Sequence, residues 1–377
     1  MKNPPVSTLF INRLLGMAVI LTLFSILSCT AQSPVDRVTV FKRAQSLDNG
    51  ISISWLEQTW NNNIFSKDAI KASDFQLLKQ LGFKSIRLPV AFGYFQANSN
   101  SQQKILGYVD QVFKLCQLYG FRLIICYHPG NLSENTNLTD NQKVIDLWVL
   151  LAKKYIHENA NNLFFELYNE PPHMDPKVWE NAANSIIAAI RKIDQKRTLI
   201  VGASKYNSIY ELSRTVPLND GNIIYTFHFY EPFFFTHQGA TWIGDQVATT
   251  GVPFPYDKQT FPPLSPKAKN TWGETNYYQY NRDRNEQSVR DKLQIVKNWA
   301  LKYNVPLLCG EYGVYNQYAD LDSRCRYIKA VRQTLKTMGI PGMLWDYNTN
   351  FSIFEGTPSI SNLPDCMKDA IGFTFKK

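Results

Sequence analysis

Short apolar runs alternate with longer amphipathic segments along most of the chain. The apolar runs predict strands buried on both faces, and the amphipathic segments predict helices between them. The predicted strands are Gly50–Ser54, Lys84–Leu88, Arg122–Tyr127, Leu163–Tyr168, Thr198–Val201, Asn222–Phe229, Val305–Cys309 and Gly342–Trp345. The predicted helices are Ala69–Leu81, Gln103–Tyr119, Asp140–Asn159, Pro176–Lys192, Tyr206–Leu212, Ser288–Tyr303 and Ser323–Met338. This repeat favours an α/β fold, the (β/α)8 TIM barrel. No G-x-G-x-x-G opens a helix, which argues against an open nucleotide-binding sheet.

One interval breaks the alternation. Residues 231–286, rich in Pro, Phe, Tyr and Trp, separate the sixth strand from the next long helix. Loops of this length inside a domain are usually functional, and this one leaves the carboxyl end of a strand, the catalytic face of barrels. We therefore predict a small insertion subdomain, or lid, between strand six and helix six. A decorative insertion is the alternative.

The amino-terminal residues are typical of a targeting signal. Lys2 and Arg13 precede an apolar run, Leu14–Leu27, that is too short for a comfortable membrane span. Ile26-Leu27-Ser28-Cys29 resembles a bacterial lipoprotein box, which would place a lipid anchor on Cys29. Ordinary signal-peptide cleavage is the alternative. We expect an exported protein, as an outer-membrane or cell-surface lipoprotein, periplasmic or secreted. The expected division is a signal peptide at 1–29, an N-terminal linker at 30–47 and the barrel at 48–377.

Charge and cysteine content exclude some classes of protein. The 40 Lys and Arg against 31 Asp and Glu give a net charge of +9, but the basic residues are scattered, so no nucleic-acid partner is expected. None of the six cysteines forms a C-x-x-C pair, which argues against a zinc cluster. Whether the cysteines form disulfides stays open. Aromatic residues make up 14% and many lie in loops, where they suit the apolar faces of sugar rings.

Two glutamates follow separate predicted strands. Asn169-Glu170-Pro171 comes after Leu163–Tyr168, and Glu311 comes after Val305–Cys309. A carboxylate at the end of a buried strand costs free energy unless it is paired or used. Carboxyl ends of barrel strands meet at one face, so the two glutamates form the pair that a retaining glycosidase needs. One would act as acid/base and the other as nucleophile, about 5 Å apart.

Polar or aromatic side chains also end the other strands. Each of them alone has an ordinary structural interpretation, but six strands that deliver such residues to one end of the barrel indicate a site. Besides Glu170 and Glu311, these residues are Arg87, His128, Asn169, His228, Tyr230 and Trp345.

The ordered set resembles glycoside hydrolase family 5, the cellulase family on a (β/α)8 barrel, from about Asp48 to Trp345. The motifs are Ser-Ile-Arg-Leu-Pro, Cys-Tyr-His, Asn-Glu-Pro, His-Phe-Tyr, Gly-Glu-Tyr-Gly and Leu-Trp-Asp. Residues 227–238 look like the endoglucanases of this family that insert a subdomain after strand six. The first strand, Gly50–Trp55, departs from the Gly-Ile-Asn that members often carry.

The resemblance implies a retaining endo-β-1,4-glucanase that hydrolyses cellulose-like or mixed-linkage β-glucans by double displacement, without a metal or organic cofactor. It implies Glu170 as acid/base and Glu311 as nucleophile, with Arg87 and Tyr230 supporting Glu311. Asn169 would meet the sugar 2-hydroxyl, and Trp345 would be the sugar platform. Hydrogen bonds to sugar and to Glu170 would come from His128 and His228.

Other functions stay open at this point. A β-mannanase or an exo-β-1,3-glucanase of the same architecture is the main alternative, and a non-catalytic glycan-binding protein is a further one. We expect a monomer whose partner is a β-glucan oligo- or polysaccharide.

Overall fold

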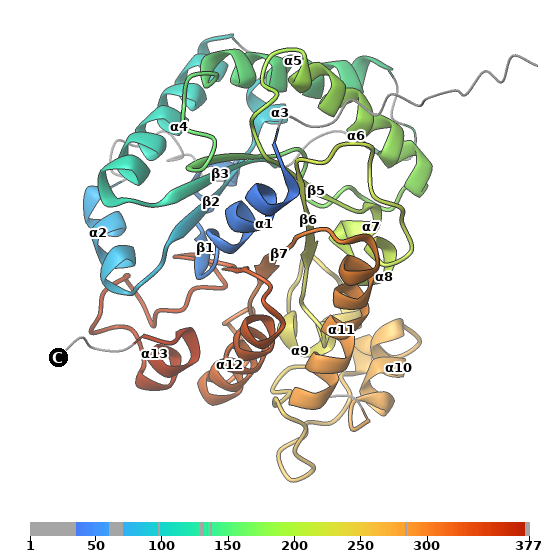
Figure 1. The fold of residues 1–377 in the computed structure, drawn as a ribbon. Helices are drawn as coiled ribbons and strands as arrows, with labels where there is room; N and C mark the ends of the chain where they lie inside the picture. Colours follow the sequence, from blue (N-terminus) through green and yellow to red (C-terminus); the bar gives the residue numbers. More distant parts are fainter. Residues whose placement is uncertain are drawn as a thin grey trace, which may run out of the picture. The chain divides into compact units, whose positions relative to one another are not determined.

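Eight parallel strands close into a barrel in chain order, with β8 paired to β1 (Figure 1). The computed structural model describes residues 35–59, 71–96, 99–128, 132–133, 135, 138–282 and 285–373. The predicted signal peptide lies outside the described residues. The strands are β1 (Gly50–Ser52), β2 (Ser85–Val90), β3 (Arg122–Tyr127), β4 (Leu163–Glu166), β5 (Leu199–Gly202), β6 (Ile223–His228), β7 (Leu307–Tyr312) and β8 (Gly342–Leu344). The TIM-barrel prediction is confirmed.

Helices surround the barrel and cover its outer face (Figure 1). The α-helices are α1 (Arg37–Gln45), α2 (Ala72–Gln80), α3 (Phe92–Phe95), α4 (Ser99–Tyr119), α5 (Leu138–Lys154), α6 (Pro176–Arg191), α8 (Ile209–Leu212), α9 (Phe233–Thr236), α10 (Trp272–Gln279), α11 (Glu286–Tyr303), α12 (Leu321–Met338) and α13 (Asp365–Ile371). The segment α7 (Ser204–Asn207) is a short turn whose backbone is left-handed at Lys205, Tyr206 and Asn207. Three short 3₁₀ helices are η1 (Trp55–Glu57), η2 (Asp245–Val247) and η3 (Pro266–Ala268).

Helix α6 illustrates why these segments are helical. The side chain of Asp175 caps its first turn by accepting from the Lys177 N–H at 2.7 Å, and Pro176 occupies the first helical position. Its buried residues recur at intervals of three and four, which places them on the face against the barrel. They are Trp179, Ala182, Ala183, Ile186, Ile187 and Ile190.

Helix α1 lies in the segment that was expected to be a linker. It packs across the amino-terminal end of the barrel (Figure 1), where Val40, Ala44 and Leu47 contact side chains that point into the barrel. Those inward side chains are Ile124, Phe164, Ile200, Ile224, Leu308 and Met343. Residues 37–45 therefore belong to the folded barrel. Two buried positions in a nine-residue helix give a weak periodic signal, so the sequence did not reveal it.

Residues 231–286 contain α9, α10, η2 and η3 and have a core of their own. Phe234 is buried against Tyr277 and Tyr280, and the Tyr280 hydroxyl donates to the Pro253 carbonyl at 2.8 Å. Phe235 joins this core to the barrel by packing on Tyr327 of α12. Much of the aromatic content of this segment therefore holds the segment together.

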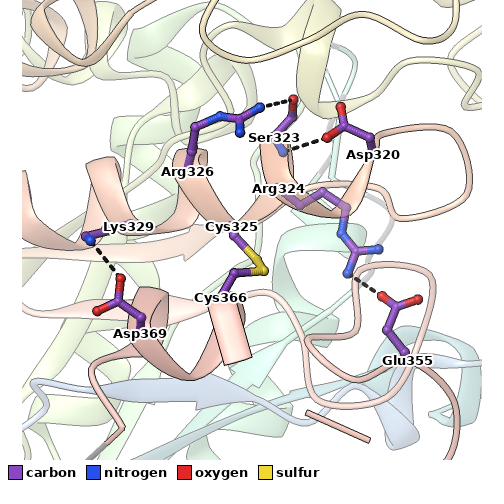
Figure 2. Close-up of a disulfide and its surroundings, with 9 residues drawn as sticks. All are labelled: Asp320, Ser323, Arg324, Cys325, Arg326, Lys329, Glu355, Cys366 and Asp369. Atoms are coloured by element: carbon purple, nitrogen blue, oxygen red, sulfur yellow. Dashed lines mark hydrogen bonds and ion pairs between the residues drawn. A yellow bond between two sulfur atoms is a disulfide. The ribbon is translucent and has the colours of Figure 1, made fainter. Parts of the chain in front are cut away.

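A disulfide between Cys325 and Cys366 joins α12 to α13 (Figure 2). The ion pairs Lys329–Asp369, at 2.7 Å, and Arg324–Glu355, at 2.9 Å, flank it. The bridge closes a stretch of 41 residues that includes β8 and the loop after it. It therefore restrains the chain on both sides of the eighth strand.

Candidate active site

The strand-end residues predicted from the sequence gather at the carboxyl-terminal face of the barrel. Six of them line a cavity of about 810 Å³, and Arg87 and His228 lie behind its wall. The six are His128, Asn169, Glu170, Tyr230, Glu311 and Trp345. Because parallel strands all end at this face, residues from six strand ends meet although they are far apart in the sequence.

Glu170 and Glu311 face each other across this cavity. One carboxylate oxygen of each lies within 4.8 Å of the other. The Glu170 side chain is 31% exposed, whereas that of Glu311 is 6% exposed. Retaining glycosidases hold their two carboxyl groups about 5 Å apart, and inverting enzymes leave room for a water between groups about 6.5–9.5 Å apart. The separation matches the retaining geometry.

Arg87 is the centre of a buried network beneath Glu311. Its guanidinium donates to Glu311 Oε1 at 2.7 Å and to the Asn169 side-chain oxygen at 2.7 Å. It also donates to both carboxylate oxygens of Glu166, at 2.6 and 2.8 Å. Such charge-assisted, planar contacts fix the orientation of each partner. With its oxygen on Arg87, the Asn169 amide nitrogen points away from the guanidinium.

Glu166 was not predicted as a site residue. It is fully buried in β4 and lies two residues after the inward-pointing Phe164, so alternation along the strand places it inside the barrel. The signal was present in the run Leu-Phe-Phe-Glu-Leu-Tyr, since a charge in an apolar strand requires a buried partner.

Tyr230 completes the hydrogen bonding of Glu311. Its hydroxyl donates to Glu311 Oε2 at 2.8 Å, so both oxygens of this carboxylate accept a hydrogen bond. Burial, reinforced by the Glu311 charge, raises the pKa of Tyr230 well above its usual value. Tyr230 is therefore a hydrogen-bond donor throughout the working pH range.

His228 contacts both carboxylates. Its Nδ1 lies 2.6 Å from Glu170 Oε1 and 3.4 Å from Glu311 Oε2. Burial raises the pKa of Glu170, but the hydrogen bond and charge of His228, with smaller effects of His128 and Arg87, lower it below its usual value overall. Burial raises the pKa of Glu311; His228 and Arg87 oppose this shift and Glu170 adds to it.

Repulsion from the Glu311 charge alone would instead raise the pKa of Glu170. The reason for the lowered value is the close contact with His228, whose hydrogen bond and charge oppose the effect of burial on the pKa of Glu170. A neutral imidazole can donate a hydrogen bond but carries no charge, so the proton state of His228 decides how far Glu170 is perturbed.

The opposite wall of the cavity holds His128 and Trp345. His128 Nδ1 lies 2.6 Å from Glu57 Oε2, and burial lowers the pKa of His128 while the Glu57 carboxylate raises it, with a raised value overall. The rings of His128 and Trp345 lie 6.2 Å apart. Glu57 and the insertion residues His237 and Trp242 also line the cavity, and none of them lies in a long strand or helix whose sequence pattern would identify it.

Two carboxyl groups at retaining distance, the buried one held by an arginine and a tyrosine, define a glycoside hydrolase on a TIM barrel. The chain matches the family model for cellulase, glycosyl hydrolase family 5, over residues 46–351. It therefore belongs to that family and is a glycoside hydrolase.

Several relatives are similar over most of this chain. It is 31% identical over 348 residues to Endoglucanase 3 of Fibrobacter succinogenes, covering 85% of this chain but only 52% of that relative. It is 31% identical over 334 residues to Endoglucanase C of Acetivibrio thermocellus, covering 82% of this chain and 94% of the relative.

The fold is also seen in solved structures. An endoglucanase from the hyperthermophile Thermotoga maritima superposes with a TM-score of 0.72 at 24% identity, covering 89% of this chain and 100% of that one.

Proposed function

We propose that this protein is a retaining endo-β-1,4-glucanase acting on cellulose-like or mixed-linkage β-glucans. The observation that carries the proposal is the carboxylate pair within 4.8 Å, with both oxygens of Glu311 hydrogen-bonded. The names of the two curated relatives, both endoglucanases, support the choice of substrate.

Glu311 is the nucleophile in this mechanism. Its ionised carboxylate attacks the anomeric carbon and forms a covalent glycosyl-enzyme intermediate. Hydrogen bonds from Arg87 and Tyr230 orient it, and the Arg87 charge favours its ionised form. Glu311 loses its negative charge as the intermediate forms. When water hydrolyses the intermediate, Glu311 is released as a carboxylate, and the same donors stabilise it again.

Glu170 is the acid/base. It donates a proton to the departing glycosidic oxygen and then removes a proton from the water that attacks the intermediate. The first step requires a protonated Glu170, and a neutral His228 at 2.6 Å permits this because it donates a hydrogen bond without a positive charge. Asn169 supplies a hydrogen bond to the 2-hydroxyl, and Trp345 supplies the sugar platform.

Endo action is supported by space on both sides of the catalytic pair. Glu170, Tyr230 and Trp242 line the main cavity and also a second one of about 780 Å³. The second cavity contains neither Glu311 nor Trp345, so it lies on the side where the leaving group departs. Tyr206 and Trp272 border it, with 55% and 42% of their surfaces exposed. An extended glucan can therefore continue past the cleaved bond.

The test compares polysaccharides and product patterns. The purified protein should lower the viscosity of carboxymethylcellulose faster than it releases reducing ends, and should act on mixed-linkage β-glucan. Glu311→Ala is the matched inactive control. Faster turnover of mannan or laminarin would favour the β-mannanase or exo-β-1,3-glucanase alternative, and no turnover by a folded protein on any of the four would refute an enzymatic role on these glycans.

Location is part of the proposal. The Cys325–Cys366 disulfide supports export, since disulfides persist in oxidising compartments. Among the described residues no helix is long and apolar enough to cross a membrane. We propose a lipid anchor at Cys29. Cys29→Ser should move the protein from the membrane to the soluble fraction, whereas an unmodified mature amino terminus by mass spectrometry would favour ordinary secretion.

A further inference from the structure

Three consecutive residues after β5 adopt a left-handed backbone. Lys205 has φ 57° and ψ 53°, Tyr206 has φ 62° and ψ 42°, and Asn207 has φ 54°. None is glycine, and this conformation costs about 1–2 kcal/mol per residue. Such strain persists where the surroundings over-determine it, often at functional sites.

The left-handed turn is tied to the segment that carries the acid/base. The backbone N–H groups of Lys205 and Tyr206 donate to the carbonyls of Pro172 and Pro171, at 3.1 and 2.9 Å. These prolines directly follow Glu170, which itself has a positive φ of 40°. The turn therefore braces the backbone on which Glu170 is mounted.

The turn also directs the side chain of Asn207 at His228. Asn207 is fully buried, and its Nδ2 lies 3.2 Å from His228 Nε2. Two glycines provide the room: a Cβ on Gly202 would lie 1.9 Å from Asn207 Oδ1, and a Cβ on Gly310 would lie 3.1 Å from His228 Nε2. The asparagine and the imidazole are thus packed between two strands with little freedom to move.

Hydrogen-bond complementarity assigns the protons of His228. Its Nδ1 faces Glu311 Oε2 and Glu170 Oε1; the ionised Glu311 oxygen accepts, and Glu170 Oε1 accepts when the acid proton is on Oε2, so Nδ1 carries a hydrogen. In a neutral imidazole the other nitrogen then accepts, and only the NH₂ end of the Asn207 amide can donate to it. The charged and titratable groups around this ring are Glu170, Glu311, Tyr230, Arg87 and His128.

We propose that Asn207 is a positioning residue that holds His228 as the neutral Nδ1–H tautomer, so that Glu170 can keep the proton it donates. The effect on proton donation by Glu170 rests on the proposed function, whereas the tautomer of His228 does not. A doubly protonated His228 would add a positive charge 2.6 Å from Glu170 and favour its carboxylate form.

The first experiment reads the tautomer by NMR. The chain has five histidines, so ¹⁵N-histidine labelling gives a small set of imidazole signals, and loss of one set in His228→Gln assigns it. In the parent protein His228 should show a protonated Nδ1 and an unprotonated Nε2. In Asn207→Asp, which preserves shape and tolerates the left-handed backbone, Nε2 should become protonated, because a carboxylate can only accept.

Asn304→Asp is the matched control. Asn304 also has a left-handed backbone, with φ 51°, but it is the exposed C-cap of α11 before β7, at the opposite end of the barrel. This variant should leave the His228 signals unchanged.

The second experiment separates proton donation from general damage. For Asn207→Asp, kcat/KM on cellotetraose should fall about tenfold, a part of the 10²–10⁴ typical of general acid–base catalysis. On dinitrophenyl cellobioside, whose leaving group needs no proton, it should change by less than about twofold. The basic limb of the pH profile on cellotetraose should move to lower pH.

An Nε2–H tautomer of His228 in the parent protein would overturn the proposal, even if no variant folds. Unchanged His228 signals in Asn207→Asp, or equal losses on both substrates, would also overturn it. The NMR spectrum needs no substrate, so it can refute the tautomer while the glucanase activity stands. Likewise, the activity assays can refute the glucanase proposal while the tautomer stands.

Discussion

Asp346, the residue after Trp345, allows a quantitative test of electrostatics at the edge of the site. Its side chain is fully buried and accepts hydrogen bonds from Ser54 Oγ and from the Thr349 N–H and hydroxyl, the last at 2.8 Å. Burial, only partly offset by these hydrogen bonds, raises its pKa from 3.8 to about 6. The folded protein therefore holds this proton more tightly than the unfolded chain does.

The sign of the effect follows from that difference. Below about pH 4 Asp346 is protonated in both states and has no effect on the pH dependence of stability. Between about pH 4 and 6 the unfolded chain releases the proton first, so the free energy of unfolding falls as pH rises. Above about pH 6 the loss is complete, and the difference from 3.8 to about 6 corresponds to about 3 kcal/mol.

Asp346→Asn removes this dependence while preserving the hydrogen bonds, since the amide oxygen can accept from Thr349 and the amide nitrogen can donate to Ser54. The difference in free energy of unfolding between the variant and the parent should be about 3 kcal/mol more favourable to the variant at pH 7 than at pH 4. Urea unfolding at the two pH values measures this, with the exposed residue change Asp291→Asn as the control. An equal stability difference at both pH values would show that the pKa of Asp346 is not raised in the folded protein.

Three further changes test other parts of the structure. Arg87→Met leaves two buried carboxylates unpaired and should cost about 3–5 kcal/mol in urea unfolding at pH 7; full stability would contradict the network. Trp242→Ala, at the cavity wall, should lower kcat/KM about tenfold on polymer but little on an aryl cellobioside. Phe234→Ala, in the core of the insertion, should instead lower the free energy of unfolding by about 3–5 kcal/mol and affect both substrates equally. Cys366→Ser opens a 41-residue loop and should cost about 4 kcal/mol, a loss that reductant reproduces in the parent protein but does not deepen in the variant.

Much of the barrel could be predicted because its strands are buried on both faces. Val305–Cys309 is apolar throughout and Leu163–Tyr168 is interrupted only by Glu166, and the turn-rich segments between such runs separate strand from helix. The observed strand ends differ from the predicted ones by a few residues, as for β4, which ends at Glu166 and not at Tyr168. Backbone hydrogen bonding between neighbouring strands decides such boundaries, and it leaves no local pattern.

The proximity of Glu170 and Glu311 could be predicted because both follow buried strands of one barrel, and a carboxylate at such a position needs a partner or a chemical use. The supporting groups were harder to identify. Glu57 lies in a short 3₁₀ helix and Asn207 in a left-handed turn, so no periodic pattern marks either one. Their roles follow from distances to His128 and His228 that only the folded chain defines.

In the proposed mechanism Glu311 becomes covalently linked to the sugar while Glu170 transfers the proton. Incubating the protein with a 2-deoxy-2-fluoro-cellobioside that has a good leaving group slows breakdown of the intermediate, and peptide mass spectrometry can then locate the adduct. One fluoroglycosyl group per active site is expected, on Glu311. An adduct on Glu170 or Glu166, or no adduct together with proton NMR showing inversion at the anomeric carbon, would contradict this mechanism.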